Sequence, residues 1–330
     1  MTGYTATRPL PRRVSRFDAQ EFERGERHRF LLEVPGADRS WDIPGIFLRG
    51  SRPGKTLVIT AGVHGDEYEG VGAIFDLTSC LDPSQMSGGL LCVPVTNVAA
   101  FWAGTRTNPV DGKNLARAFP GSPDGSLSDR IAFIVGEEII AKADLYLDLH
   151  SAGVKFAMPT LIGYDSDEPL SRAAAIAFGG PVLWGSPFSS PGRTVSVAKK
   201  RGVPGLYTEA FGAGRIRPED LRYFRKGALN LLRYLQILSG AAESEAVQWD
   251  LDGSGDIDES IVSGHRGFLV PSVRLLDRVK HGDQLGNILD LHGTCVETIV
   301  ANRDGVVVLI HAFSVVDPNE ALFLITGVRV

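Results

Sequence analysis

Several features are scarce in this chain of 330 residues, and each scarcity argues against a class of protein. The 3 cysteines, Cys80, Cys92 and Cys295, form no CxxC pair. An odd number without paired spacing argues against a disulfide framework and fits a reducing cytoplasm, where we expect the protein to act. No apolar run reaches the roughly 18 residues that span a bilayer, and no apolar segment follows the N-terminal arginines. We therefore expect neither a membrane segment nor a signal peptide.

A basic surface and a serine-hydrolase motif are also missing. The net charge of −5 provides no basic footprint, so nucleic acid is not an expected partner. The serines near Ser151 lack a Gly-x-Ser-x-Gly elbow, which disfavours a serine hydrolase. What is present is an ordinary globular composition, with 43% hydrophobic and 22% charged residues. Such a chain can bury a substantial core, and its length favours two domains or one large domain with an appendage.

From residue 55 onward, short apolar runs alternate with amphipathic helical patterns. This alternation predicts an α/β fold of three layers, with a mixed, largely parallel sheet and helices on both faces. Continuous apolar strands imply burial on both sides. The expected strands are Thr56–Ala61, Gly89–Val95, Leu145–Leu149, Thr160–Gly163 and Gly205–Glu209, and the expected helices lie near Glu67–Cys80, Ser128–Ala141, Leu170–Ala177 and Pro218–Leu238.

The sequence divides into three parts. We expect a catalytic domain at 1–240, whose first 55 residues (1–55) form a β extension with a hairpin around Arg29 to Leu48. An acidic, Gly/Ser-rich linker follows at 241–259. It begins like a calcium loop at Asp250, but Ile261 stands where that loop needs a bidentate Glu, so a solvated linker is the better interpretation.

Residues 260–330 predict a small all-β domain that resembles a biotinyl/lipoyl-type barrel-sandwich. In such carriers a tight turn presents a modifiable lysine. The matching turn here, Asp290 to Gly293, contains no lysine. We therefore expect this domain to serve structure or oligomerisation, and a homo-oligomer is compatible with the sequence.

A metal site is indicated by two apolar runs that each end in histidine. His64-Gly-Asp-Glu67 follows Thr56–Ala61, and a His-x-x-Glu at a strand exit would set an imidazole and a carboxylate one helical turn apart. His150 ends a second run. Two histidines and a glutamate form a catalytic zinc site with the fourth position left for water. The expected cofactor is one zinc per chain, although cobalt fits the same ligands.

Other carboxylates lie close to these ligands in the sequence. Asp148 is two residues before His150 and faces the same side of a strand, so it either orients an imidazole or faces solvent. Asp66 and Glu69 differ in phase from the ligands and are expected on a solvated helix surface. Glu209 ends an apolar strand at the sheet edge where α/β proteins bind ligands, which makes it a candidate general base. The alternative for Glu209 is a helix N-terminal carboxylate.

Together with His64, Glu67 and His150, further residues complete an ordered series, which runs through Arg106, Asp111 to Gly121, and Leu206 to Gly212. From about Thr56 to Gly212 the series resembles the succinylglutamate desuccinylase/aspartoacylase family of zinc carboxypeptidase-like deacylases.

The resemblance implies Glu209 as the base, Arg106 as the arginine that stabilises the oxyanion, and Arg117 as the anchor of a substrate carboxylate. Surface ion pairs are the alternative for both arginines. Relatives carry Asn beside that anchor, whereas this chain has Ala116. One substrate contact is then missing, or Asn114 supplies it from another direction.

The sequence therefore predicts a zinc-dependent amidohydrolase that removes the acyl group from an N-acyl amino acid or a related small N-acyl amine. A zinc carboxypeptidase acting on short peptides is the alternative within the same chemistry. A binding protein that keeps the metal without catalysis is the alternative from a different class.

Overall fold

The computed structural model describes residues 11–243, 245–253 and 255–329. The central element of the fold is a large mixed sheet with the strand order β1-β2-β3-β5-β4-β6-β10-β8-β9-β11-β19-β17-β14. The strands β5, β4, β6 and β10 at the centre of this order run parallel to one another, as the prediction of a mixed, largely parallel sheet requires. In chain order the first eleven strands are β1 (Arg12–Val14), β2 (Glu26–Leu32), β3 (Ile43–Arg49), β4 (Arg52–Ala61), β5 (Ser87–Val93), β6 (Leu145–Ser151), β7 (Phe156–Ala157), β8 (Leu161–Asp165), β9 (Val182–Ser186), β10 (Gly205–Ala210) and β11 (Trp249–Asp252).

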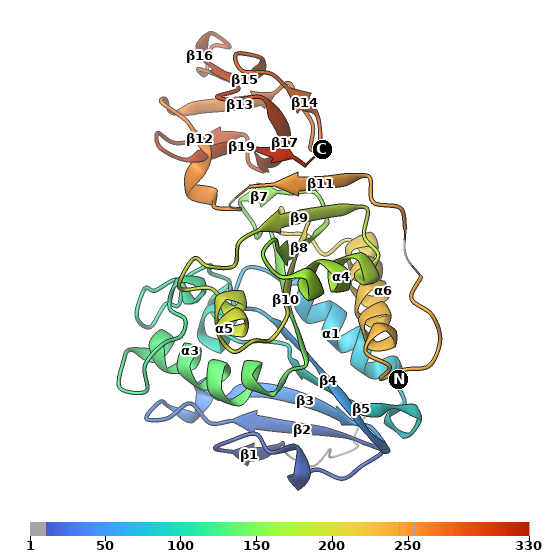
Figure 1. Ribbon diagram of the computed structural model, residues 1–330. Coiled ribbons are helices and arrows are strands. Elements are labelled where there is room, and N and C mark those ends of the chain that lie inside the picture. Colours follow the sequence, from blue (N-terminus) through green and yellow to red (C-terminus); the bar gives the residue numbers. More distant parts are fainter. Residues whose placement is uncertain (1–10, 244, 254, 330) are drawn as a thin grey trace, which may run out of the picture.

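Helices cover both faces of this sheet, so the predicted three layers are confirmed (Figure 1). The cause is the apolar run in β4, whose side chains alternate between faces. Leu57 and Ile59 pack in the core under α1, α4 and α6, whereas Val58 packs in the core under α3 and α5. The helices are α1 (Glu69–Cys80), α2 (Val98–Ala103), α3 (Leu127–Glu138), α4 (Pro169–Phe178), α5 (Thr194–Lys200) and α6 (Pro218–Tyr234).

The predicted hairpin, strands and helices of the α/β part are all found, and the strands β1, β7, β9 and β11 and the helices α2 and α5 are additional. The start of α1 differs from the prediction. This helix begins at Glu69, so His64 and Glu67 lie in the turn ahead of it and not on its first turn. Gly65 permits this turn, because a Cβ there would lie 2.0 Å from the carbonyl carbon of Ala100.

The stretch 241–259 was expected to be a linker, but part of it forms a strand. Its residues Trp249–Asp252 form β11, which pairs with β9 on one side and with β19 on the other. Leu251 is completely buried, and this apolar position in an acidic stretch explains why a strand forms there. Asp250 and Asp252 bond to separate partners, Tyr164 and Arg329 among them, and not to one shared site. Ser254, which belongs to the calcium-like pattern, lies outside the described residues.

The C-terminal region is all β, as predicted. Its strands are β12 (Ile261–Val262), β13 (Gly267–Pro271), β14 (Arg278–Val279), β15 (Gln284–Leu289), β16 (Cys295–Val300), β17 (Gly305–His311), β18 (Val315–Val316) and β19 (Ala321–Val328). A separate antiparallel sheet in the order β16-β15-β13-β18 packs against β17 and β19 around a core that includes Leu285, Val307 and Phe323. Because β11 and β19 join this region to the large sheet, the domain boundaries at 240 and 260 remain a prediction.

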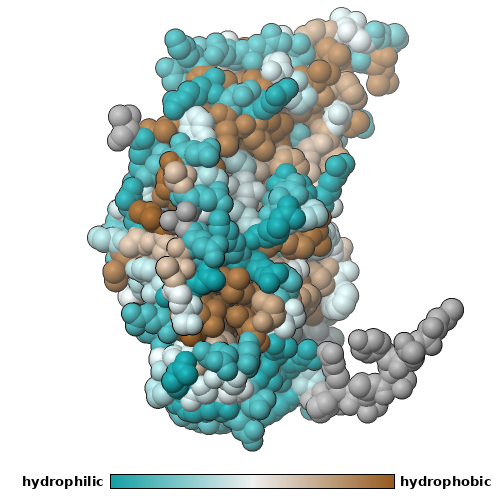
Figure 2. Space-filling model, turned by 90° about the vertical axis from the view of Figure 1, so that its right-hand side faces the viewer, coloured by the Kyte–Doolittle hydropathy of each residue, from teal (hydrophilic) through white to brown (hydrophobic). Residues whose placement is uncertain are grey.

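Apolar side chains are exposed on the C-terminal β region, at the top of Figure 2. They include Phe268, Val296 and Val315, and Leu291 at the tip of the turn between β15 and β16 is 98% exposed. This surface is where the predicted oligomerisation would be sought, and that role remains a prediction. Within the described residues, the helices are too short or too polar to span a membrane.

Candidate metal centre and active site

Three parallel strands deliver the site residues to one edge of the sheet. In the ladder between β10 and β6, Glu209 lies beside His150 and Tyr207 lies beside Asp148. In the ladder between β4 and β6, Thr60 lies beside Asp148. Residues paired in this way, or two apart on a strand, share a face. The register therefore gathers all five side chains on one face.

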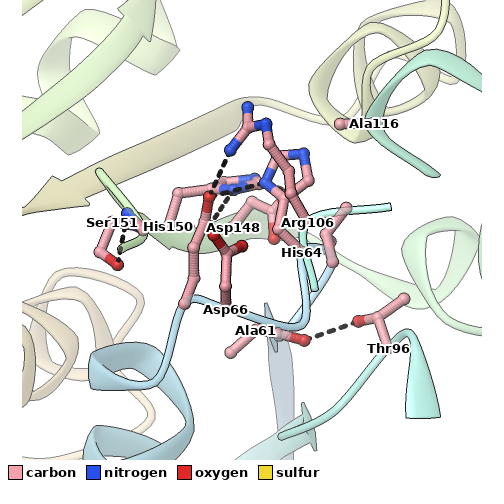
Figure 3. A network of polar contacts seen from close by, with 12 residues as sticks. Ala61, His64, Asp66, Thr96, Arg106, Ala116, Asp148, His150 and Ser151 are labelled. Carbon is pink, nitrogen blue, oxygen red and sulfur yellow. Dashed lines mark hydrogen bonds and ion pairs between the residues drawn. The ribbon is translucent and has the colours of Figure 1, made fainter. Parts of the chain in front are cut away.

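His64, Glu67 and His150 converge there as a metal-binding triad. Their donor atoms all lie within 4.8 Å of one another. Figure 3 shows the two histidines, His64 and His150, side by side. The Nδ1 atom of His64 is 2.7 Å from Oε1 of Glu67, and the Nδ1 atom of His150 is 2.9 Å from Oε2. Both Glu67 and His64 are almost completely buried. The geometry therefore agrees with the sequence prediction that these three residues lie together.

The second ring nitrogen of each histidine has its own partner. The Nε2 atom of His150 lies 2.9 Å from Oδ2 of Asp148, and the Nε2 atom of His64 lies 3.0 Å from Oδ1 of Asn114. Metal-binding histidines usually have this arrangement, because an outer acceptor fixes the ring and directs the other nitrogen to the metal. Of the two interpretations open for Asp148, the structure thus favours orientation of an imidazole over solvent exposure.

A buried polar network extends behind Asp148. Its Oδ1 accepts a hydrogen bond of 2.6 Å from the Thr60 hydroxyl, which in turn lies 2.5 Å from the Tyr146 hydroxyl. The Thr194 hydroxyl donates to Oδ2. Asp148 is fully buried, so these bonds replace the water that its charge would otherwise need. Thr194 was not among the predicted site residues, because the helix that it begins, α5, was not predicted either.

The chemistry of the donor set fits a cation. Burial lowers the pKa of His64, which favours the neutral imidazole that binds metals. Although burial opposes ionisation of Glu67, its interactions with His64 and His150, which include a hydrogen bond to each, hold its pKa well below the usual range. Burial and the neighbouring Glu67 raise the pKa of Glu209 to about 8. A cation at the triad would counter this repulsion and so favour the ionised form of Glu209.

Asp66 and Glu69 were expected on a solvated helix surface, but both are buried. Asp66 is 7% exposed and Glu69 is 2% exposed. Glu69 accepts a hydrogen bond of 3.1 Å from the backbone of Gly212, and Asp66 accepts one of 3.4 Å from the backbone of Val154. Helical phase alone could not reveal these partners, because they belong to loops after β10 and β6. Both carboxylates brace the loops around the metal-binding triad.

Comparisons with known proteins agree with this geometry. Residues 53–235 match the family model of the succinylglutamate desuccinylase/aspartoacylase catalytic domain. The N-alpha-acetyl-L-2,4-diaminobutyric acid deacetylase of Halomonas elongata is 32% identical over 296 residues, which cover 86% of each chain. The chain belongs to the succinylglutamate desuccinylase/aspartoacylase family. The expected class of enzyme, a deacylase of N-acyl amino compounds, is thereby confirmed, and the alternative of a binding protein without catalysis is set aside.

Solved structures of the family show the same fold over almost the whole chain. A succinylglutamate desuccinylase/aspartoacylase from Rhodobacter sphaeroides is 27% identical with a TM-score of 0.83, over 96% of this chain and 100% of that one. The product-bound ectoine utilization protein EutE (DoeB) from Ruegeria pomeroyi is also 27% identical with a TM-score of 0.83, over 92% of this chain and 96% of that one. These matches include the C-terminal β region, which the family model does not cover.

The two predicted arginines of this deacylase occupy different places around one cavity. The Nη1 atom of Arg106 lies 3.1 Å from Oε1 of Glu67, directly at the metal-binding triad. Arg117 lines the cavity further out, where its Nη2 lies 3.3 Å from Oδ1 of Asp256. Ala116 also lines the cavity, so the place of the family's asparagine is apolar here.

Two walls of this cavity come from distant parts of the sequence. We call His64, Glu67, Arg106, His150 and Glu209 the sheet wall. The β-domain wall consists of Gly255, Ile257, Leu309 and Leu324. Gly255 precedes the 3-10 helix η6 (Ile257–Glu259), which contains Ile257, and the two leucines belong to β17 and β19. The sequence offered no signal for the second wall, because its residues look like ordinary linker and core positions.

Proposed function

We propose that this chain is a zinc-dependent deacetylase of Nα-acetyl-2,4-diaminobutyrate or a closely related N-acetyl diamino acid. The relative from Halomonas elongata, which acts on N-alpha-acetyl-L-2,4-diaminobutyric acid, supports the substrate class. The ligand set of His64, Glu67 and His150 supports zinc, because two imidazoles and one carboxylate are a known catalytic combination for this metal.

The observation that carries the proposal is the place of Glu209 beside the metal-binding triad. It is the neighbour of His150 in the β6–β10 ladder, and it lines the same cavity. Its Oε2 atom is buried, and no hydrogen-bond partner for it is found among the described residues. A buried carboxylate that lines the cavity beside the metal-binding triad, with one oxygen not engaged by a described residue, is suited to exchange a proton with bound water.

The reaction is the hydrolysis of an amide. When bound, zinc lowers the pKa of a water molecule and polarises the acyl carbonyl. Glu209 takes the proton from the attacking water and returns it to the leaving nitrogen as the C–N bond breaks. Arg106 donates to the oxygen on which negative charge develops. The products are acetate and the free diamino acid.

The outer residues hold the rest of the substrate. Arg117 anchors the carboxylate of the amino acid, since a guanidinium pairs with it through two parallel hydrogen bonds. Asn114 holds His64 through Oδ1, and the same oxygen accepts from the backbone of Ala116 at 2.9 Å. We propose orientation of His64 as its main role, and its contact with substrate stays a prediction.

The test is a hydrolysis screen of purified protein after zinc content is measured. We expect close to one zinc per chain and the highest kcat/KM on Nα-acetyl-2,4-diaminobutyrate, with less on N-succinyl and N-formyl amino acids. Dipeptides belong in the same screen, because faster cleavage of peptides would replace this proposal with the carboxypeptidase alternative. A chelator should abolish hydrolysis, and added zinc should restore it.

A further inference from the structure

A carboxylate from the junction with the β domain lies between two arginines of the cavity. Asp256 contacts Arg117 at 3.3 Å (Oδ1 to Nη2) and Arg193 at 3.7 Å (Oδ2 to Nη2). Both arginines line the cavity, and so do Gly255 and Ile257, the neighbours of Asp256 in the chain. The side chains of Arg117 and Asp256 are 40% and 31% exposed, so solvent or a ligand can reach this group.

Local structure holds the three charges together. Gly192 lies against Arg117, and a Cβ at Gly192 would be 2.8 Å from the Cα atom of Arg117. Its φ of +93° also favours glycine, so the loop carrying Arg193 can approach Arg117 this closely. Asp256 is the N-cap of η6 and accepts a hydrogen bond of 3.2 Å from the backbone of Asp258.

Charge is distributed unevenly between the inner and outer parts of the cavity. Among the described lining residues, the carboxylates are Glu67 and Glu209, which both belong to the sheet wall. The outer part presents Arg117 and Arg193, which suit a carboxylate but repel a cation. Asp256 supplies negative charge at that outer part, between the two cations.

We propose that Asp256 binds an ammonium group of the substrate and so selects acylated diamino acids over acylated monoamino acids. This proposal deepens the proposed function and rests on it. An N-acetyl diamino acid carries one carboxylate and one remaining ammonium group. The carboxylate pairs with the arginines, and the ammonium donates to Asp256, so opposite charges alternate across the complex.

A different role for Asp256 makes the opposite prediction. Its carboxylate could occupy the arginines in place of the substrate's carboxylate and leave when substrate binds. Removing the charge would then strengthen binding of every N-acetyl amino acid. Recognition of an ammonium group instead predicts a loss that is confined to substrates carrying that group.

The experiment compares Asp256→Asn with wild type on two substrates, Nα-acetyl-2,4-diaminobutyrate and Nα-acetyl-2-aminobutyrate, which lacks the ammonium group. Asn can still cap η6, so the fold should be retained. We expect kcat/KM on the diamino substrate to fall by about 10- to 100-fold, chiefly through KM, as loss of a charge-assisted bond predicts. On the monoamino substrate the change should stay within about threefold by the same reasoning.

Two further variants sharpen the comparison. Asp256→Glu should restore part of the preference for the diamino substrate, because it restores the charge. Asp258→Asn removes an exposed carboxylate two residues away on the same 3-10 helix and should leave the preference unchanged. Equal changes on both substrates, in either direction, would overturn the assignment of Asp256.

Calorimetric binding of the amines 2,4-diaminobutyrate and 2-aminobutyrate separates this inference from the proposed function. Wild type should bind the diamine more tightly, and Asp256→Asn should lose that difference. If wild type binds the diamine selectively but deacetylates neither substrate, the proposed function fails and the recognition by Asp256 stands. If wild type shows no preference for the diamine, the inference about Asp256 is overturned.

Discussion

The two walls of the cavity differ in chemistry, and the difference separates reaction from recognition. The sheet wall is polar and charged, and its metal ligands have partners for both ring nitrogens. The β-domain wall presents Ile257, Leu309 and Leu324, which can contact a substrate but cannot transfer a proton. Amide hydrolysis needs the first wall whatever the substrate is. A change in the second wall would alter contacts with the substrate without removing a group that reacts.

The walls also differ in how they are held. Two residues of the sheet wall, His150 and Glu209, depend on the register of β6 and β10, because a slip by one residue would turn a side chain to the other face. The β-domain wall depends on the pairing of β11 with both β9 and β19. Because the sheet is continuous through β11, the second wall is fixed relative to the first.

The largest effect is expected in the sheet wall, from Glu209→Gln. This variant keeps the size of the side chain but removes the proton acceptor. We expect kcat to fall by about 10²- to 10⁴-fold, the usual contribution of a general acid–base group, while zinc content and fold are retained. Metal analysis, circular dichroism and steady-state kinetics on one preparation test this.

Two controls accompany Glu209→Gln. His64→Ala should lose the metal together with activity, since two remaining ligands hold zinc poorly. Glu69→Gln changes another buried carboxylate nearby, but its amide oxygen can still accept from Gly212, so activity should stay within about tenfold of wild type. Near-normal turnover by Glu209→Gln would remove this residue from the mechanism.

An intermediate effect is expected from Asp148→Asn, which changes the hydrogen-bond partner of the metal ligand His150. The change weakens the hydrogen bond to Nε2 of His150 and alters the bonds from Thr60 and Thr194. Loss of such an outer partner usually lowers metal affinity or activity by about 10- to 100-fold. Zinc affinity measured by competition with a chelating dye should show the loss. The control is Asp165→Asn, a buried carboxylate on β8 that pairs with Lys199 at 2.9 Å, which should leave zinc affinity unchanged.

The residues of the sheet wall could be predicted from the sequence, because most of them are potential metal ligands or proton acceptors that stand at the ends of apolar runs. His64, Glu67, His150 and Glu209 each follow or end an apolar run, and parallel strands bring their ends to one edge. The burial of the other carboxylates near the metal-binding triad was harder to predict. Helical phase places Asp66 and Glu69 on a solvated surface, because it carries no information on the loops that pack over the start of a helix.

The β-domain wall could not be predicted in the same way. Leu309 and Leu324 alternate on strands like any core residues, and nothing in that pattern shows that they also face a cavity. The acidic composition of 241–259 suggested a linker, although Leu251 marks a strand. Contacts between elements far apart in sequence depend on how the strands assemble into one sheet, which local patterns do not record.

The smallest effect is expected in the β-domain wall, from Ile257→Ala. Ile257 is partly buried and lines the cavity, so the change removes apolar contact with the substrate but no group that reacts. Losing part of a buried aliphatic side chain is worth about 1 kcal/mol, which corresponds to a rise in KM of roughly fivefold with kcat nearly constant. Steady-state kinetics on Nα-acetyl-2,4-diaminobutyrate measure both constants. The matched control is Ile216→Ala, which makes the same truncation at a side chain that is 51% exposed and should change neither constant. A fall in kcat with an unchanged KM for Ile257→Ala would instead place the β-domain wall in the chemical step and erase the division between the two walls.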